Sequence, residues 1–195
     1  GPVVFNLIDA SYSGSETFPI VIGNNPDASA TNTLTIKPAT TASISGAVAN
    51  NSLIRFTSAR YVTIDGSNSG GNDQSLTITN TSTTAPTAFS MVSMGTGLGT
   101  TNSTIKNCIL STGTVTSGAS YGISIGATTP GTSQVDNDNA TVQNNTITGA
   151  TIGIYAVGGA SVSAGGNDNL TISGNSVTTN TTLASLGIQV GNALN

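Results

Sequence analysis

The chain has 195 residues, a formal net charge of −4 and only 12 charged side chains, four basic and eight acidic. Histidine is absent, which excludes Ser/His/Asp hydrolysis, Cys/His proteolysis and His-ligated metal sites as they are usually built. Four basic residues provide no surface for phosphates, so we expect no nucleic-acid partner. No apolar run approaches the roughly 18 residues that span a bilayer, so we expect a soluble chain without membrane insertion.

The composition indicates an all-β protein. Thr, Ser, Asn and Gly fill 103 of the 195 positions, whereas the helix formers Glu, Lys, Arg and Gln are scarce. Thr favours strands, and Gly and Asn favour turns. Disorder is the alternative for so polar a chain, but 36% apolar residues in short regular clusters argue against it. The single cysteine, Cys108, cannot form an internal disulfide, and its apolar surroundings predict a buried thiol.

An internal repeat organises the chain from its first third to its end. A Thr followed by Ile or Val recurs at intervals of 28 to 41 residues. The five segments are Leu34-Thr35-Ile36, Val62-Thr63-Ile64, Ser103-Thr104-Ile105, Ala140-Thr141-Val142 and Leu170-Thr171-Ile172. We expect this strand first in each repeat, a second strand after a brief turn, as in Asn145-Thr146-Ile147, and a third after a loop, as in Ile152-Gly153-Ile154.

Three short strands cannot bury an apolar face alone, so the repeats are expected to stack as coils of a parallel solenoid. Equivalent side chains then lie in columns about 4.8 Å apart. The predicted inward columns are Ile36, Ile64, Ile105, Val142 and Ile172; Leu110, Ile147 and Val177; and Ile123, Ile154 and Ile188. The Thr of each first strand points outward, and Asn145 and Asn175 stack at the next turn. We therefore predict a single parallel β-helix domain over residues 1–195, with three strands per coil and about six coils.

These repeats resemble the right-handed parallel β-helix repeats of the pectate-lyase-like superfamily. The run from Gly1 to Ile22, the run from Tyr61 to Ser67 and the Asn-rich Thr-Ile repeats are similar to β-helical regions of very large secreted or surface-anchored bacterial proteins. The resemblance implies a right-handed β-helix in a secreted or cell-surface protein. It implies little about activity, because the shared residues are core and turn positions.

Enzymes of that superfamily cleave acidic polysaccharides with a calcium-assisted base or with clustered Asp residues. The nearest group here is Lys37, Asp65 and Lys106, which should occupy one outward position on three successive coils. We interpret this column as an exposed salt-bridge ladder, because a lyase-like site needs acidic ligands beside its base. No catalytic residue is assigned, and a β-helix that binds or cleaves acidic glycans stays the alternative to a structural module.

One group of acidic and amide side chains is a candidate metal site. Asn137-Asp138-Asn139 and Asn167-Asp168-Asn169 precede the Thr-Ile strands of two repeats at identical offsets, so Asp138 and Asp168 should stack on adjacent coils. Two carboxylates so close repel each other, and a Ca²⁺ ion would relieve the repulsion. The alternative is solvated loop chemistry with no bound cofactor. The candidate ligands are Asp136, Asn137, Asp138, Asn167 and Asp168.

Two further surface functions fit the sequence poorly. Sugar binding requires exposed aromatic rings. Of the eight aromatic residues, only Tyr155 and Tyr61 are expected on the outside, and two isolated rings do not form a stacking surface for a sugar. The outward Thr column suggests ice binding, which needs two matched ranks on a flat surface. The flanking column argues against it, because it is irregular: Lys37, Asp65, Lys106, Gln143 and Ser173.

The ends of the solenoid bear on its role. A β-solenoid presents unpaired strand edges at both ends, which are usually covered by a helix or a polar cap. The chain starts in an apolar strand and stops after a third strand, so we expect either a segment of a longer solenoid or subunits that stack end to end. The expected function is a structural or adhesive module of a secreted or cell-surface protein, as a rigid spacer, stalk or self-stacking fibre unit.

Overall fold

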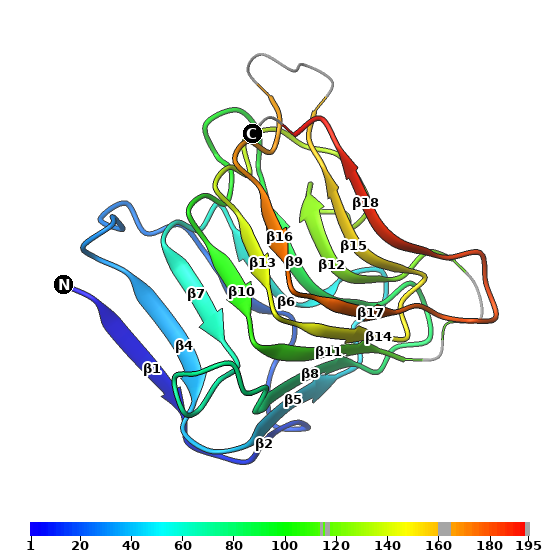
Figure 1. The fold of residues 1–195 in the computed structure, drawn as a ribbon, viewed down its shortest axis with the longest axis horizontal. Helices are drawn as coiled ribbons and strands as arrows, with labels where there is room; N and C mark the ends of the chain where they lie inside the picture. Colours follow the sequence, from blue (N-terminus) through cyan, green and yellow to red (C-terminus); the bar gives the residue numbers. More distant parts are fainter. Residues whose placement is uncertain (114, 116–117, 160–164, 194–195) are drawn as a thin grey trace.

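The computed structural model describes residues 1–113, 115, 118–159 and 165–193, which form 18 β-strands and no helix. Accordingly, none of these residues belongs to a helix able to span a membrane. The strands lie in three parallel sheets of six strands, here named A, B and C (Figure 1). The chain visits the sheets in that order and then returns to sheet A. It completes five turns from β1 to β16, and β17 and β18 follow, which confirms the predicted parallel β-helix.

Each coil contributes one strand to each sheet. Sheet A contains β1 (Val3–Leu7), β4 (Leu34–Pro38), β7 (Val62–Asp65), β10 (Thr104–Lys106), β13 (Thr141–Gln143) and β16 (Thr171–Ser173). Sheet B contains β2 (Ser11–Tyr12), β5 (Ala42–Gly46), β8 (Leu76–Asn80), β11 (Cys108–Thr112), β14 (Thr146–Thr148) and β17 (Ser176–Thr178). Sheet C contains β3 (Ile20–Ile22), β6 (Ser52–Thr57), β9 (Thr87–Val92), β12 (Tyr121–Gly126), β15 (Ile152–Val157) and β18 (Leu186–Gly191).

Backbone pairing places equivalent repeat positions directly over one another. In sheet A the paired threonines are Thr35, Thr63, Thr104, Thr141 and Thr171. They alternate with inward residues and are half-buried, except for the exposed Thr171. The predicted outward Thr column is therefore confirmed.

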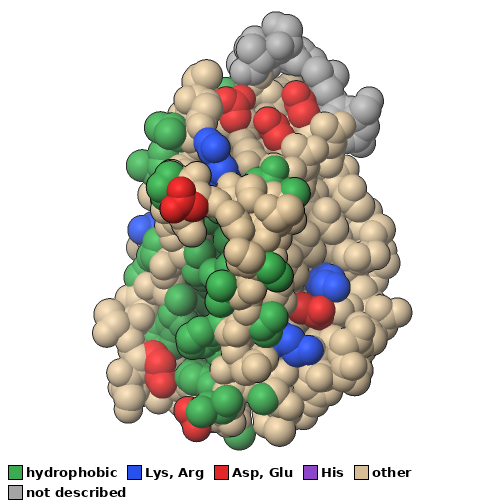
Figure 2. Space-filling view, turned by 90° about the vertical axis from the view of Figure 1, so that its left-hand side faces the viewer, with side chains coloured by type: hydrophobic (Ala, Val, Ile, Leu, Met, Phe, Trp, Pro, Cys, Tyr) green, Lys and Arg blue, Asp and Glu red, His purple; other side chains and the backbone are tan. Residues whose placement is uncertain are grey.

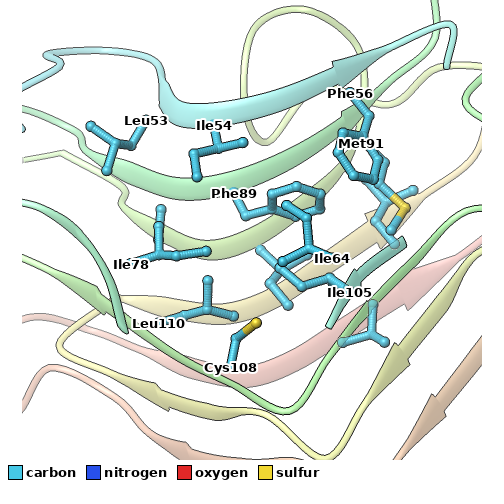
Figure 3. Close-up of a cluster of buried hydrophobic side chains, with 14 of the residues drawn as sticks. Leu53, Ile54, Phe56, Ile64, Ile78, Phe89, Met91, Ile105, Cys108 and Leu110 are labelled. Atoms are coloured by element: carbon cyan, nitrogen blue, oxygen red, sulfur yellow. The ribbon is translucent and has the colours of Figure 1, made fainter. Parts of the chain in front are cut away.

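Apolar columns from the three sheets meet in the interior, where Figure 3 shows their side chains pointing toward one another. The column of sheet A consists of Phe5, Ile36, Ile64, Ile105, Val142 and Ile172. The column of sheet B consists of Tyr12, Ile44, Ile78, Leu110, Ile147 and Val177. The column of sheet C consists of Ile20, Ile54, Phe89, Ile123, Ile154 and Ile188. All three predicted columns are confirmed, and the structure extends each of them into the first coil.

The middle coils are the driest part of the molecule. Ile105, Leu110 and Ile123 are all 0% exposed. Phe56 and Phe89 pack edge to face there, with their ring centroids 4.9 Å apart. Fully burying a side chain of this size contributes roughly 1.5 to 3 kcal/mol, so these coils hold most of the hydrophobic stabilisation.

One corner column changes from apolar to amide along the solenoid. Its members are Ala42, Leu76, Cys108, Asn145 and Asn175. Asn145 accepts a hydrogen bond from the Cys108 N–H at Oδ1 (3.0 Å) and donates from Nδ2 to the Ile105 carbonyl (3.1 Å). Asn175 accepts from both the backbone N–H and the Nδ2 of Asn145, each at 3.0 Å. The predicted stacking of Asn145 on Asn175 is confirmed, and the buried amide of Asn145 is satisfied by the neighbouring coils.

Both end coils leave apolar side chains in contact with solvent. At the N-terminal end Val3, Val4 and Phe5 are 56 to 59% exposed, and Figure 2 shows hydrophobic side chains gathered in a band across this end. A recess of about 270 Å³ opens there between the three sheets, and its lining residues, including Phe5, Tyr12 and Ile20, are all apolar or aromatic. At the other end Ile188 and Val190 are each 50% exposed.

We expect Ile105→Ala to lower the free energy of unfolding by about 2 to 5 kcal/mol, because it leaves a cavity in the centre of the sheet A column. Ile105→Val removes one methyl group and should cost only about 1 kcal/mol. Urea unfolding followed by circular dichroism measures both. Thr104→Ala, on the outer side of the same strand, is the control. If this variant lost as much stability as Ile105→Ala, the assigned direction of the column would be contradicted.

Candidate functional site

The acidic corner comprises Asp136, Asn137, Asp138, Asn167 and Asp168, in the loops that lead into β13 and β16. Asp138 and Asp168 lie on adjacent coils, as predicted, and the Asp168 N–H donates to Asp138 Oδ1 at 2.9 Å. Asp136 takes a left-handed backbone (φ 63°), and its Oδ2 accepts the Gly97 N–H at 2.6 Å. The identical offsets thus bring the two carboxyl groups together, each on its own coil.

The two asparagines of the corner point into the molecule rather than to solvent. Asn137 is 0% exposed, accepts the Thr100 N–H at Oδ1 (3.0 Å) and donates from Nδ2 to the Gly126 carbonyl (3.1 Å). Asn167 is also 0% exposed, but its Oδ1 and Nδ2 have no hydrogen-bond partner among the described residues. Asn137 is therefore fixed as a structural link between coils, whereas Asn167 is a buried amide that costs stability.

The surroundings of Asp138 shift the pKa of its carboxyl group. Partial burial raises the pKa of its carboxyl group above the ordinary value. The hydrogen bond from the Asp168 N–H opposes this shift, and the negative charges of Asp168 and Asp136 add to it. Among the described residues, no three Asp, Glu, Cys or His side chains gather closely enough to hold a metal ion. A Ca²⁺ ion there would need amide or backbone oxygens as well, and calcium binding stays a prediction.

The charged column on sheet A contains one ion pair instead of a ladder. Lys106 Nζ lies 3.1 Å from Asp65 Oδ2, and no other ion pair joins described residues. Asp65 Oδ1 accepts Asn107 Nδ2 at 2.7 Å and the Ser67 N–H at 3.1 Å. Lys37 lies one coil earlier, outside the pair. Both oxygens of Asp65 are thus occupied by structural contacts at the corner between sheets A and B.

The loop from Gly66 to Ser75 was not foreseen as a structural unit. Asp73 accepts hydrogen bonds from the hydroxyls of Ser67 (2.6 Å), Ser69 and Ser75 (2.8 Å). These bonds hold the pKa of the Asp73 carboxyl well below its usual range. The signal in the sequence is the three serines that bracket one Asp, a pattern of side chains bonding within a loop.

This loop reaches over the following coils. The Asn72 carbonyl accepts Asn144 Nδ2 at 3.0 Å, and Gln74 Nε2 donates to the Asn144 carbonyl at 2.7 Å. Gln74 Oε1 also accepts the hydroxyl of Thr146 at 2.8 Å. Asp73 is bonded within this loop and does not join the acidic corner. The loop therefore clamps the corner between sheets A and B.

Cys108 is buried, as predicted, and is 0% exposed. Burial raises the pKa of the Cys108 thiol, and the negative charge of Asp65 raises it further. Its Sγ lies 3.1 Å from the Lys106 carbonyl, to which the thiol donates. A protonated thiol in a closed site is not a nucleophile.

The aromatic side chains provide no platform for a sugar ring. Tyr155 lies on the outer side of sheet C, but it is only 7% exposed, which corrects the expectation of an exposed ring. It packs edge to face against Tyr121, with the centroids 5.7 Å apart. The segment that follows β12 covers this face, because the Gly131 N–H donates to Ser124 Oγ at 3.1 Å.

Comparison with known proteins gives no relative: no protein-family model matches the chain, and no curated protein and no solved structure is significantly similar to it.

We expect Asp138→Asn to raise the free energy of unfolding at pH 7 by roughly 0.5 kcal/mol at most, because water screens a partly exposed charge. The variant keeps Oδ1 as acceptor for the Asp168 N–H. Since the pKa of Asp138 is raised on folding, the wild-type chain gains stability as the pH falls through that value, and the difference between the proteins should fade. Melting temperatures measured between pH 4 and pH 7 check this.

The same pair of proteins tests the candidate metal site. Calcium at about 1 mM should raise the melting temperature of the wild type and leave Asp138→Asn unchanged, because the ion would lose a charged ligand. A chelator should reverse the effect. A wild-type melting temperature that neither calcium nor chelator shifts would remove the predicted site.

We expect Cys108 to resist alkylation in the native protein, because its thiol is buried and protonated. Iodoacetamide labelling followed by mass spectrometry measures the rate, with and without urea. Labelling should become fast only where the chain unfolds. Fast labelling without urea would contradict the buried position.

Proposed function

We propose that the chain is a non-catalytic structural or adhesive module of a secreted or cell-surface protein, where it serves as a rigid spacer, stalk or self-stacking fibre unit. One observation carries the proposal. The three apolar columns run without a break through all coils, and both end coils present them to solvent. Each end can therefore accept a further coil, either from the same polypeptide or from a second copy of this chain.

Rigidity follows from how the coils are joined. Each coil is bonded to the next through three parallel strand pairs, one in each sheet. Bending the rod would break pairs on one side or compress the core on the other. At about 4.8 Å per coil the described part extends only about 30 Å, so reach has to come from additional coils or additional subunits.

The compartment and the superfamily are inferred from the sequence. The repeats resemble right-handed pectate-lyase-like β-helices of large secreted or surface-anchored bacterial proteins. The chain has few charges and a single, buried thiol, and neither feature conflicts with an extracellular setting.

The contacts of the charged column support a non-catalytic role. A lyase base has to be free to take a proton from its substrate. Lys106 is instead paired with Asp65, whose second oxygen accepts two further hydrogen bonds. No described acidic side chain other than Asp65 forms an ion pair with Lys106, so the pair links two neighbouring coils.

We expect the sedimentation coefficient of the purified chain to rise with protein concentration, as coils of neighbouring copies meet. Ile188→Lys puts a charge on the inward column of the last strand, β18, and should keep the protein monomeric. Gln189→Lys is the matched control, because it places the same charge on the same strand in the outward column. Sedimentation velocity compares the three proteins.

Two outcomes would contradict parts of this proposal. Strictly monomeric wild type at every concentration would remove the self-stacking unit and leave a spacer inside a longer solenoid. Cleavage of polygalacturonate or alginate in the presence of Ca²⁺, lost in Lys106→Ala, would replace the structural role with the glycan-cleaving alternative.

A further inference from the structure

The outer face of sheet B carries two parallel ranks of small hydroxyl side chains. The first rank is Ser43, Thr77, Ile109, Thr146 and Ser176. The second rank is Ser45, Thr79, Ser111, Thr148 and Thr178. Nine of these ten positions are Ser or Thr, none is charged, and each rank continues in register over five successive coils. On sheet A, by contrast, the column beside the Thr column is charged and irregular, which argues against ice binding on that face alone.

The side chains of the two ranks are open to solvent. They are half-buried in β5, β8, β11 and β14 and exposed in β17, as is usual for side chains that stand on a sheet. The hydroxyls without a hydrogen-bond partner in the described structure are those of Ser45, Thr77, Thr79, Ser111, Thr148, Ser176 and Thr178. Thr146 donates to Gln74, and Ser43 reaches the Ala10 carbonyl at a long 3.4 Å. The outer face of sheet B therefore presents hydroxyl groups that are available to donate and accept hydrogen bonds with a ligand.

The other two faces of the solenoid lack this arrangement. Sheet A pairs its Thr column with the ion pair of Lys106 and Asp65. On sheet C the outward Ser90 and Ser124 are each 1% exposed, beneath the segments that cover that face. Only sheet B combines two regular ranks, hydroxyl chemistry and accessibility within the described residues.

The geometry fixes the spacing of the ranks. Neighbouring strands lie about 4.8 Å apart, and residues two apart on a parallel strand lie about 6.6 Å apart, so the hydroxyls form a nearly rectangular grid. β-Branched Thr side chains prefer few rotamers, so the grid is largely ordered before any ligand arrives. A soluble ligand is usually held in a concave site that buries most of its surface. A regular grid on the outside of a sheet instead suits a ligand that is itself a repeating lattice.

We propose that the outer face of sheet B binds the surface of ice. Hydroxyl groups donate and accept hydrogen bonds as water does, so a regular grid of them can continue the hydrogen-bonded lattice of an ice surface. The Thr methyl groups and Ile109 add apolar contact between the hydroxyls. Charged groups, which order water around themselves, are absent from both ranks. Crystalline polysaccharide is the competing lattice, and its recognition would call for aromatic rings, which this face lacks.

The activity is measured with the purified chain by thermal hysteresis, crystal shaping and inhibition of ice recrystallisation. We expect the wild type to shape crystals and to separate the freezing point from the melting point. Thr79→Tyr and Thr148→Tyr, each in the second rank, should abolish both effects because the ring stands above the grid. Thr104→Tyr, in the single Thr column of sheet A, should retain them. Circular dichroism and melting temperature confirm that each variant is folded.

Three results would overturn the proposal. They are an inactive wild type, equal loss in Thr104→Tyr, and full activity in both folded sheet B variants. Binding to microcrystalline cellulose or chitin that Thr79→Tyr removes, without crystal shaping, would assign the face to a polysaccharide lattice instead. None of these readouts depends on coil stacking at the ends, so the structural role and ice binding succeed or fail separately.

Discussion

Parallel pairing of each coil with the next, in constant register, is the constraint on which the rest of the molecule depends. Every strand finds its backbone partners in the coils before and after it, so a side chain always meets the equivalent side chain of the next coil. A side chain that packs well in its column gains stabilising contacts with both neighbouring coils, and one that packs badly loses contacts with both. The constant register therefore explains the columns of Thr, Ile and Asn. Rigidity follows as well, because no coil can shift without moving its neighbours.

Polar groups enter the interior only where the stacking satisfies them. In the corner column the change from Leu76 through Cys108 to Asn145 is tolerated because the Asn145 amide bonds to the coils on either side. Asn137 follows the same rule at the acidic corner. Asn167 occupies the equivalent repeat position, but its amide finds no hydrogen-bond partner within the part of the chain that the structure describes, so the corner is polar inside as well as charged outside. Unlike charges on adjacent coils, as in Lys106 and Asp65, lower the free energy of the stack, whereas the like charges of Asp138 and Asp168 raise it.

The sequence predicts the later coils well because the first strand of each carries the same motif, a Thr followed by Ile or Val. It does not assign the first coil, because Val4 and Phe5 stand at these two positions and the motif is absent there. Contacts made by loops are equally hidden, because Gln74 reaches Asn144 across 70 residues and no periodicity signals it. At the candidate metal site the offsets correctly placed Asp138 beside Asp168. They did not reveal that the amide of Asn137 is already used, because its partners, Thr100 and Gly126, lie outside the motif.

The three faces of the solenoid share one backbone, so their functions differ only through the columns that point outward. A single substitution in such a column changes only one position on the face. Duplication of a repeat, in contrast, copies a favourable residue to the equivalent position of the next coil. This explains how a chain with so few charged and aromatic groups can still carry a defined surface. On sheet A the outward column was interrupted by charges, and on sheet C it was covered by loops. On sheet B the alternation of Thr or Ser with inward Ile, Leu or Val produced two ranks at once, because the second strand of each coil carries a hydroxyl residue on both sides of its core residue, with Ile109 as the one exception among the ten positions.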